Sequence, residues 1–267
     1  MWLGAVIVGA LALAAALAPA LTRQDPNAQP DITGLQNTAP SFSHPLGTDL
    51  YSRDVLSRTL YGSRISLSIA CVSVLLSVIL GTLVGLAAGF SGGVVDAVLM
   101  RLVDAGLAIP RILLLLAIAA LWPSFSVLAL IVVLGFTSWF GTSRLVRAEV
   151  LSVRHRDYVM ATRALGLHPA RIALQHVLPN IMAPILVTAT LGVGYMVLTE
   201  AGLSYLGFGV QQPAASLGNM IRDGEDFLLQ APWVALAPGM FVLIAVLGFS
   251  LLGDGLRDIS PAPPPHR

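Results

Sequence analysis

Long apolar segments alternate with shorter polar ones along the chain, and this alternation predicts an all-α membrane protein. Each apolar segment has about twenty residues or more, enough for a helix to cross a hydrocarbon core of ~30 Å. The expected transmembrane helices cover residues 2–21, 64–90, 98–121, 125–143, 181–203 and 232–253. The predicted organisation is a first transmembrane helix at 1–21, a polar loop at 22–63 and a core transmembrane domain at 64–267.

The first apolar segment has an alternative interpretation as a signal peptide, because Ala18-Pro19-Ala20 weakly resembles a cleavage site. However, no positive charge precedes its apolar run, and a proline next to the cut is unfavourable. We therefore expect a retained first helix. Two further polar segments, 122–124 and 204–231, are expected to be a tight turn and an irregular connection.

The composition supports a membrane protein and excludes several functions. Only 11% of the 267 residues are charged and 56% are hydrophobic, whereas soluble domains have roughly 25% charged residues. All 15 basic residues are arginines, which excludes a P-loop ATPase, because that loop needs a lysine against the phosphates. The single cysteine, Cys71, excludes an internal disulfide and is expected to be a small core residue.

The distribution of arginine predicts the orientation. With the N-terminus inside, the cytoplasmic segments are 91–97, 144–180 and 254–267, and they hold eight arginines. The outer segments hold four over a greater length. Short loops rich in positive charge stay in the cytoplasm, so both termini and segment 144–180 are expected there, and loop 22–63 outside.

Segment 144–180 is the one long polar stretch between apolar helices, and it predicts two short helices. Asp157 is expected to cap the first helix, which runs from Tyr158 to Leu165. Gly166 suits the left-handed residue that ends a helix. Pro169 suits the first turn of the second helix and Pro179 its end. One face of the first helix is expected to be available to a partner: Tyr158, Ala161, Thr162 and Leu165.

Two features inside the predicted spans are candidate functional positions. Gly81, Gly85 and Gly89 repeat every four residues and make a smooth groove, either for a helix of the same chain or for a second subunit. Glu200 is the one carboxylate deep in a predicted span. It is a candidate for the translocation path or a gate, with Met196 nearby, or else a structural residue hydrogen-bonded to the chain around 202–209.

The sequence offers little catalytic chemistry. Gly141-Thr142-Ser143 resembles the start of an intramembrane serine hydrolase motif, but Arg144 replaces the glycine that should follow. An intramembrane hydrolase remains the alternative from another functional class, and the effect of Ser143→Ala on activity would test it. His44 lies alone in a loop and is expected to be structural rather than a metal ligand. No HExxH motif or cysteine pair is present.

Several motifs in order resemble one family. Segment 157–166, DYVMATRALG, followed by Leu178-Pro179-Asn180, resembles the cytoplasmic loop of bacterial ABC importer permeases. More narrowly, the chain is similar to the C-type permease subunit of the dipeptide/oligopeptide/nickel subfamily. The phrases that carry this similarity are HPLGTD at 44–49, RDVLSR at 53–58, LTEA at 198–201, LSYLG at 203–207 and LLGDGLRD at 251–258.

The resemblance implies a type I ABC importer permease fold with six transmembrane helices. It implies that the helix at 157–165 is the coupling helix, which seats in an ATPase subunit. Met160 and Thr162 replace the glutamate and the second alanine of the general pattern, so a salt bridge from that glutamate to the ATPase is not expected.

The partners that the resemblance implies are a homologous permease subunit, two ATP-binding subunits, an extracytoplasmic substrate-binding protein and the bacterial inner membrane. ATP and magnesium would be bound by the partner subunits, and this chain is expected to bind neither a cofactor, a metal nor nucleic acid. Peptides are the expected substrate. Nickel or a metal chelate is the alternative, with Met196 and Met220 as its nearest candidate ligands.

Overall fold

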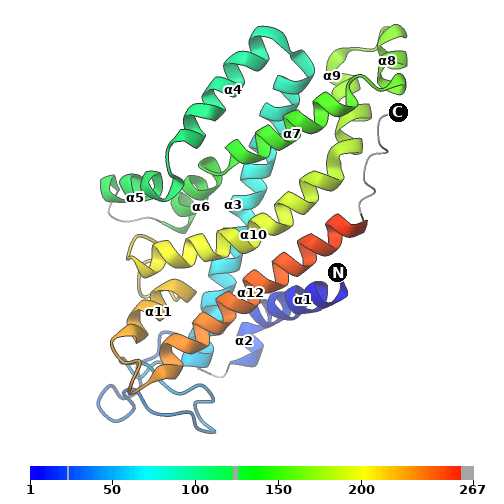
Figure 1. Cartoon of the computed structure of the whole chain (residues 1–267). Helices are drawn as coiled ribbons and strands as arrows, with labels where there is room; N and C mark the ends of the chain where they lie inside the picture. Colours follow the sequence, from blue (N-terminus) through cyan, green and yellow to red (C-terminus); the bar gives the residue numbers. More distant parts are fainter. Residues whose placement is uncertain (23, 123–125, 260–267) are drawn as a thin grey trace.

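The computed structural model describes residues 1–22, 24–122 and 126–259, and within these the secondary structure is helical apart from one isolated bridge between Thr48 and Asp54. Figure 1 shows the order of the elements. They are α1 (Trp2–Ala16), α2 (Ala18–Leu21), α3 (Val55–Ser91), α4 (Gly93–Ala108), α5 (Arg111–Leu121), α6 (Val127–Phe136), α7 (Trp139–Val153), α8 (Asp157–Ala164), α9 (Pro169–Ile172), the π-helix η1 (Ala173–Val177), the 3₁₀ helix η2 (Leu178–Ile181), α10 (Met182–Tyr205), α11 (Leu217–Glu225) and α12 (Pro232–Ile259).

Four stretches of the described chain are long and apolar enough to cross a membrane: Val55–Ser91, Val127–Val153, Pro169–Tyr205 and Pro232–Ile259. A fifth is possible if α4 and α5, which are bent by 79°, form one span. The remaining predicted span, the first along the chain at 2–21, is an apolar helix of 15 residues followed by the short α2. A helix of that length covers about 22 Å, less than a hydrocarbon core.

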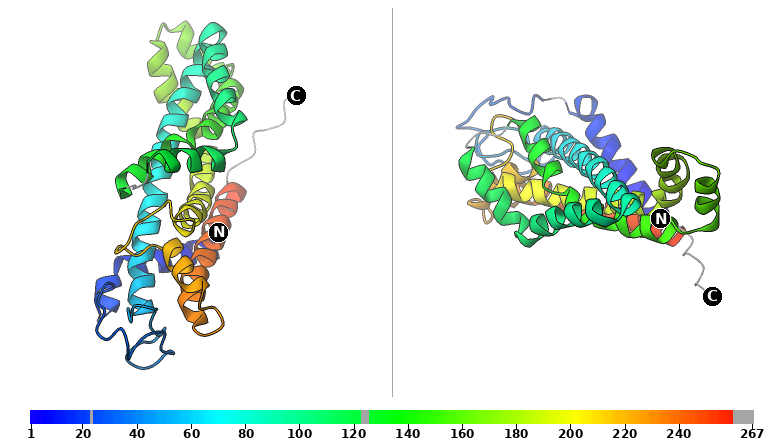
Figure 2. Two further views of the ribbon diagram at one scale, coloured as in Figure 1. Left: turned by 90° about the vertical axis from the view of Figure 1, so that its left-hand side faces the viewer. Right: turned by 90° about the horizontal axis from the view of Figure 1, so that it is seen from above.

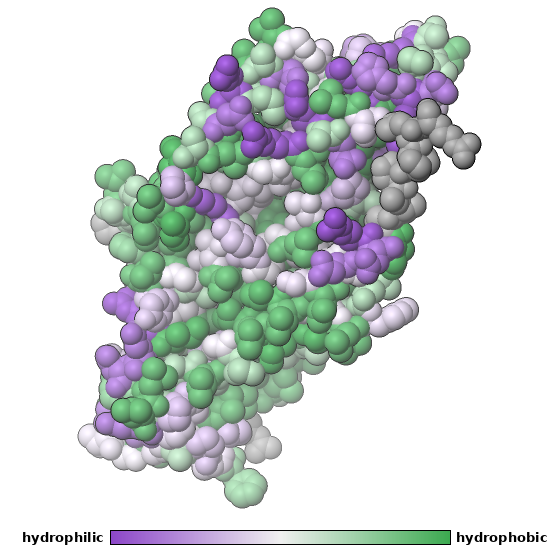
Figure 3. All heavy atoms as spheres, in the orientation of Figure 1, coloured by the Kyte–Doolittle hydropathy of each residue, from purple (hydrophilic) through white to green (hydrophobic). Residues whose placement is uncertain are grey.

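The helix α3 is the central element of the structure. It packs against α7, α10 and α6, and α12 packs against α10 and α1 (Figures 1 and 2). Helices α8 and α9 lie at one end of the molecule, and the loop between α2 and α3 lies at the other. Figure 3 shows hydrophobic side chains over α10 and α12, between polar side chains that gather towards the two ends.

The start of α3 differs from the prediction, because the helix begins at Val55 rather than at 64. The Asp54 carboxylate caps it by accepting a hydrogen bond from the Ser57 N–H at 2.7 Å. The other carboxylate oxygen lies 3.0 Å from His44 Nδ1. His44 therefore has the structural contact expected of it, with the cap of α3.

A buried charge network connects the loop before α3 to α11. Arg53 Nε donates to Asp49 at 2.6 Å, and Arg53 Nη2 lies 3.3 Å from Asp223 in α11. Arg58, which is 1% exposed, lies 3.6 Å from Asp49. Burial raises the pKa of the Asp223 carboxyl above its usual range, while Arg53 and Arg58 act in the opposite direction. These contacts hold three segments together at one end of the molecule.

Two predicted spans are broken. The span predicted at 98–121 bends between α4 and α5 at Ile109-Pro110, because proline has no N–H to donate and disfavours helical geometry in the preceding residue. The span predicted at 125–143 is interrupted between α6 and α7 and then continues to Val153. The tight turn predicted at 122–124 lies largely outside the described residues.

The glycine groove on α3 is filled by α7 of the same chain. A Cβ atom on Gly81 would lie 2.6 Å from Thr142 Cβ, and one on Gly85 would lie 2.6 Å from the Ser143 carbonyl oxygen. Gly89 faces Val150 in the same way, at 2.8 Å. Of the two alternatives for this groove, packing within the chain is the one that the structure contains.

We expect Gly85→Ala to destabilise the protein, because its methyl group would overlap the α7 backbone. Overpacking of this kind costs about 1–3 kcal/mol. The measurement is the apparent unfolding temperature of the purified protein in detergent, which should fall by several degrees. Gly141→Ala is the matched control, since Gly141 is also helical but has nothing within 4 Å of its Cβ position. Equal unfolding temperatures for the two variants would contradict the close contact.

Candidate functional site

The helix α8 lies at one end of the molecule, beside α9 (Figure 1). It covers Asp157–Ala164, so the predicted helix is present within one residue at each end. Its N-cap is Arg156 rather than Asp157, and no side chain caps it. Asp157 lies in the first turn instead, where a negative charge favours the positive end of the helix dipole.

Gly166 ends α8 as predicted, with a φ of 77°. The Gly166 N–H donates to the Arg163 carbonyl at 2.9 Å, and the Leu167 N–H donates to the Thr162 carbonyl at 3.3 Å. These two bonds form the Schellman motif, which requires a left-handed residue at the position of Gly166. No neighbouring atom lies within 4 Å of a Cβ built there, so the requirement for glycine comes from the backbone conformation.

One side of α8 is anchored to the ends of the long helices. Val159 is fully buried in a hydrophobic cluster. The other buried members of this cluster are Leu86, Val146, Val150, Val153, Ile172, Val177, Ile181 and Ile185. The Arg163 guanidinium lies 4.8 Å from the centre of the Phe90 ring, and Arg154 Nη1 donates to the Gly89 carbonyl at 2.9 Å. Both contacts attach this region to the end of α3.

The opposite side of α8 is exposed. Tyr158, Ala161 and Leu165 are exposed, and Leu165 is 78% exposed. Thr162 is half-buried, and its hydroxyl donates to the Val159 carbonyl at 2.7 Å. Met160 is also half exposed. The predicted face is therefore present, with an apolar surface that no other part of the described chain covers.

The second short helix does not end at Pro179, as the sequence had suggested. The chain passes from α9 through η1 and η2 into α10, so that Pro169–Tyr205 forms one continuous helical element. A π-helical turn followed by a 3₁₀ turn changes the spacing of backbone groups around the proline, and this accommodates Pro179 without a break. As a result, only residues 165–168, which include Gly166, separate α8 from the helical element that leads into α10.

Glu200 lies at the other end of α10 and has no exposed surface. The Ser204 hydroxyl donates to Glu200 Oε1 at 2.7 Å, and the Ser66 and Ser216 side chains lie beside the carboxyl. Its Oε2 atom has no geometrically acceptable hydrogen-bond partner. Gly218 brings α11 against the Ala201 backbone next to Glu200. The carboxyl therefore sits where α10 contacts α3 and α11.

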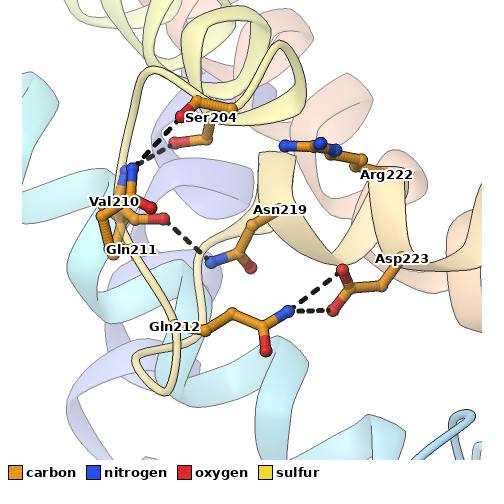
Figure 4. A pocket seen from close by; sticks show the side chains of 8 residues that line it. Ser204, Val210, Gln211, Gln212, Asn219, Arg222 and Asp223 are labelled. Atoms are coloured by element: carbon orange, nitrogen blue, oxygen red, sulfur yellow. Dashed lines mark hydrogen bonds between the residues drawn. The ribbon is translucent and has the colours of Figure 1, made fainter. Parts of the chain in front are cut away.

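The helix α11 lies within residues 204–231, which were predicted to be an irregular connection. Ser216 and Asn219 form a reciprocal capping box at the start of this helix. A cavity of about 290 Å³ lies between this region and the end of α10 (Figure 4). Gln212 donates to both oxygens of Asp223 there, at 3.1 and 2.9 Å. Ser204 lines the cavity, whereas Glu200 does not.

The remaining sequence candidates are Ser143, Met196, Met220 and Cys71. Ser143 is buried, and its hydroxyl donates to the Phe140 carbonyl at 2.7 Å. Met196 and Met220 are both buried. Cys71 is exposed, so its assignment to the core was wrong; it lies on an outward-facing side of α3.

The acidic side chains of α4 bind arginines on α7. Asp104 lies 3.0 Å from Arg144, and Asp96 accepts two hydrogen bonds from Arg147. Asp104 therefore forms an ion pair with a residue of another helix. Because α7 continues past 143, both arginines are helical and can reach across.

Comparison with known proteins identifies the class. The family described as "binding-protein-dependent transport system inner membrane component" matches residues 81–261. The chain belongs to this family of membrane permeases. Members are transport components, so the prediction of a non-catalytic transport subunit is confirmed.

Individual relatives cover nearly the whole chain. It is 40% identical over 256 residues to the dipeptide transport system permease protein DppC of Alkalihalophilus pseudofirmus, across 96% of this chain and 83% of that protein. It is 38% identical to the oligopeptide transport system permease protein OppC of Bacillus subtilis, with the same shares of each chain. A putative peptide transport system permease protein of Brucella suis is 41% identical, across 96% of this chain and 86% of that protein.

A solved structure has the same fold. This structure, of the MetNI methionine ABC transporter in inward-facing conformations, matches with a TM-score of 0.61 at 21% identity. The match covers 76% of this chain and 96% of that one. This match supports the predicted ABC importer permease fold.

The position of Glu200 favours a structural role for its side chain. We expect Glu200→Gln to leave assembly and stability near those of the original protein, because glutamine keeps the acceptor that Ser204 uses. Glu200→Leu should destabilise the protein by about 1–3 kcal/mol, since the buried Ser204 hydroxyl loses its partner. Unfolding temperatures of the detergent-purified variants test this. Normal stability with lost transport in Glu200→Gln would instead place the carboxylate in the translocation path.

Proposed function

We propose that this chain is a permease subunit of an ATP-driven importer of di- or oligopeptides. It would form the translocation path together with a homologous permease subunit. The observation that carries the peptide assignment is the 38–41% identity, over 96% of the chain, to permeases named for dipeptide, oligopeptide and peptide transport. The buried positions of Met196 and Met220 give the metal-chelate alternative no exposed sulfur.

The helix α8 is the element that we assign to coupling with an ATPase subunit. It is the short helix that combines an exposed apolar face, carried by Tyr158, Ala161 and Leu165, with a buried anchor at Val159. The exposed face provides a contact surface. The anchor, together with the continuous helix Pro169–Tyr205, lets a force on α8 reach the membrane helices.

The orientation follows from this assignment and from the arginines. Segment 144–180 and both termini lie in the cytoplasm, and the loop between α2 and α3 lies outside with α11. The opposite placement of α8 and of this loop in Figure 1 is consistent with such an orientation. Six membrane spans result if α1 with α2, and α4 with α5, each cross the bacterial membrane.

The proposed assembly contains a homologous permease, two ATP-binding subunits and an extracytoplasmic substrate-binding protein. ATP and magnesium belong to the ATP-binding subunits. Membership of a binding-protein-dependent transport family supports these partners. The cavity beside α11 lies on the outer side in this orientation, where a binding protein would dock.

Purification of the tagged chain from its native membrane in mild detergent tests the assembly. We expect a second permease, two ATP-binding subunits and a binding protein to copurify, as identified by mass spectrometry, with peptide bound to the binding protein. A Leu165→Asp variant is the matched sample, and it should lose the ATP-binding subunits while keeping the second permease. Recovery of the chain without any ATPase would remove the proposed energy source.

The left-handed end of α8 gives a second prediction. Gly166→Val should lower peptide uptake at least about tenfold while ATP hydrolysis continues, because a β-branched residue does not tolerate a φ of 77°. Gly166→Asn is the control, since asparagine adopts this conformation more readily, and it should keep most of the uptake. The measurements are uptake and ATPase activity of the complex in proteoliposomes. Equal uptake by both variants would contradict a coupling role for this cap.

A further inference from the structure

Arg111 is a charged residue within the apolar part of the chain. It is the first residue of α5, directly after the bend at Pro110. The helix that follows has no other charged residue. Placing an arginine within the hydrocarbon part of a membrane is energetically costly. A position of this kind is retained where the charge faces protein or water and not lipid.

The contacts of Arg111 are all with neutral groups. Its Nη2 atom donates to the Leu134 carbonyl at 3.3 Å and to the Met196 sulfur at 3.5 Å. The guanidinium carbon lies 5.4 Å from the centre of the Tyr195 ring. Its Nε atom is buried and has no hydrogen-bond partner. Among the described residues, no carboxylate lies within ion-pair distance of this arginine.

A sharply bent span and a span with a two-residue interruption meet at Arg111. One break is the bend between α4 and α5, at which the arginine begins a helix. The other lies between α6 and α7, and the Leu134 carbonyl that accepts from Arg111 belongs to the last turn of α6. Transporters place substrate sites at such interruptions, where the positive end of a half-helix points at an anionic group. Here the guanidinium and the N-terminus of α5 supply positive charge at the same point.

The neighbouring surface of α10 is open in this chain. Tyr195 is 57% exposed, and Leu191 and Leu198 are exposed on the same side of the helix. This surface therefore faces lipid, the second permease or the translocation path. An arginine in contact with Tyr195 disfavours lipid, which leaves the other two.

We propose that Arg111 binds the C-terminal carboxylate of a peptide as it passes through the permease. The proposal rests on the proposed peptide import function. Every free peptide carries this group, and an arginine fork matches its geometry. The present contacts, a carbonyl, a thioether and an aromatic ring, are weaker than a charge-assisted bond to a carboxylate. The arginine can exchange them for the substrate without breaking an ion pair.

Peptide uptake by the complete complex in proteoliposomes tests whether the positive charge of Arg111 is needed for transport. We expect Arg111→Gln to lower the uptake of a dipeptide with a free C-terminus at least about tenfold, while Arg111→Lys keeps uptake within about threefold. Complexes of both variants should contain all subunits and show normal peptide affinity of the binding protein. Wild-type uptake by Arg111→Gln would overturn the proposal and leave peptide import itself intact. Absence of uptake by the wild-type complex would instead overturn the proposed function.

Cysteine labelling tests the location and does not depend on uptake. Arg111→Cys is made in a Cys71→Ala background, because the native cysteine is exposed, and the complex is treated with an anionic, water-soluble methanethiosulfonate reagent. We expect labelling that dipeptide and binding protein slow during ATP turnover. Val132→Cys, an exposed apolar position on α6, is the comparison for an exposed side chain without a charge. No labelling in any nucleotide state, or labelling that peptide does not slow, would overturn the proposal.

Discussion

The contact between α3 and α7 determines where the functional end of the molecule lies. Apolar side chains gain little from leaving lipid, so close packing holds membrane helices together. Three glycines on α3 allow the α7 backbone to approach to a distance at which no side chain fits. Beyond this contact, α7 continues to Val153 and supplies three valines to the cluster that buries Val159. The position of α8 is therefore a consequence of the glycine groove.

This arrangement packs α8, the helix that we propose for coupling, against the ends of the long helices. The region of α8 is attached to α3 through Phe90 and Gly89, and α8 is attached to α7 through Val159 and its cluster. Residues 165–168 join it to the helical element that continues into α10. A displacement of α8 would act on the long helices through these buried contacts. The bend between α4 and α5 lies outside this group of helices, whereas the interruption between α6 and α7 adjoins it at the start of α7.

Local signals predicted the helix α8 well, whereas tertiary contacts decided the features that sequence reasoning missed. Gly166 ends α8 for a backbone reason that the residue itself reveals. The early start of α3 depends on burying Arg58 in a charge network, so a polar helix turn resembled a loop. Pro179 indicated a helix end, but a π-helical turn accommodates it. Arg111 was overlooked as one charge in an apolar run, although its position after Pro110 was a usable signal.

The helix α10 connects the two ends of this mechanism. It is the larger part of the helical element Pro169–Tyr205. This element follows α8 after residues 165–168 and is held to α11 through the buried Glu200 region at its other end. Between these ends, Tyr195 and Met196 contact the Arg111 guanidinium. Any movement of α10 relative to α5 therefore changes the groups around this charge. A carboxylate that binds Arg111 better in one state favours that state by the difference in binding free energy, so occupancy of the path and the position of α8 become linked.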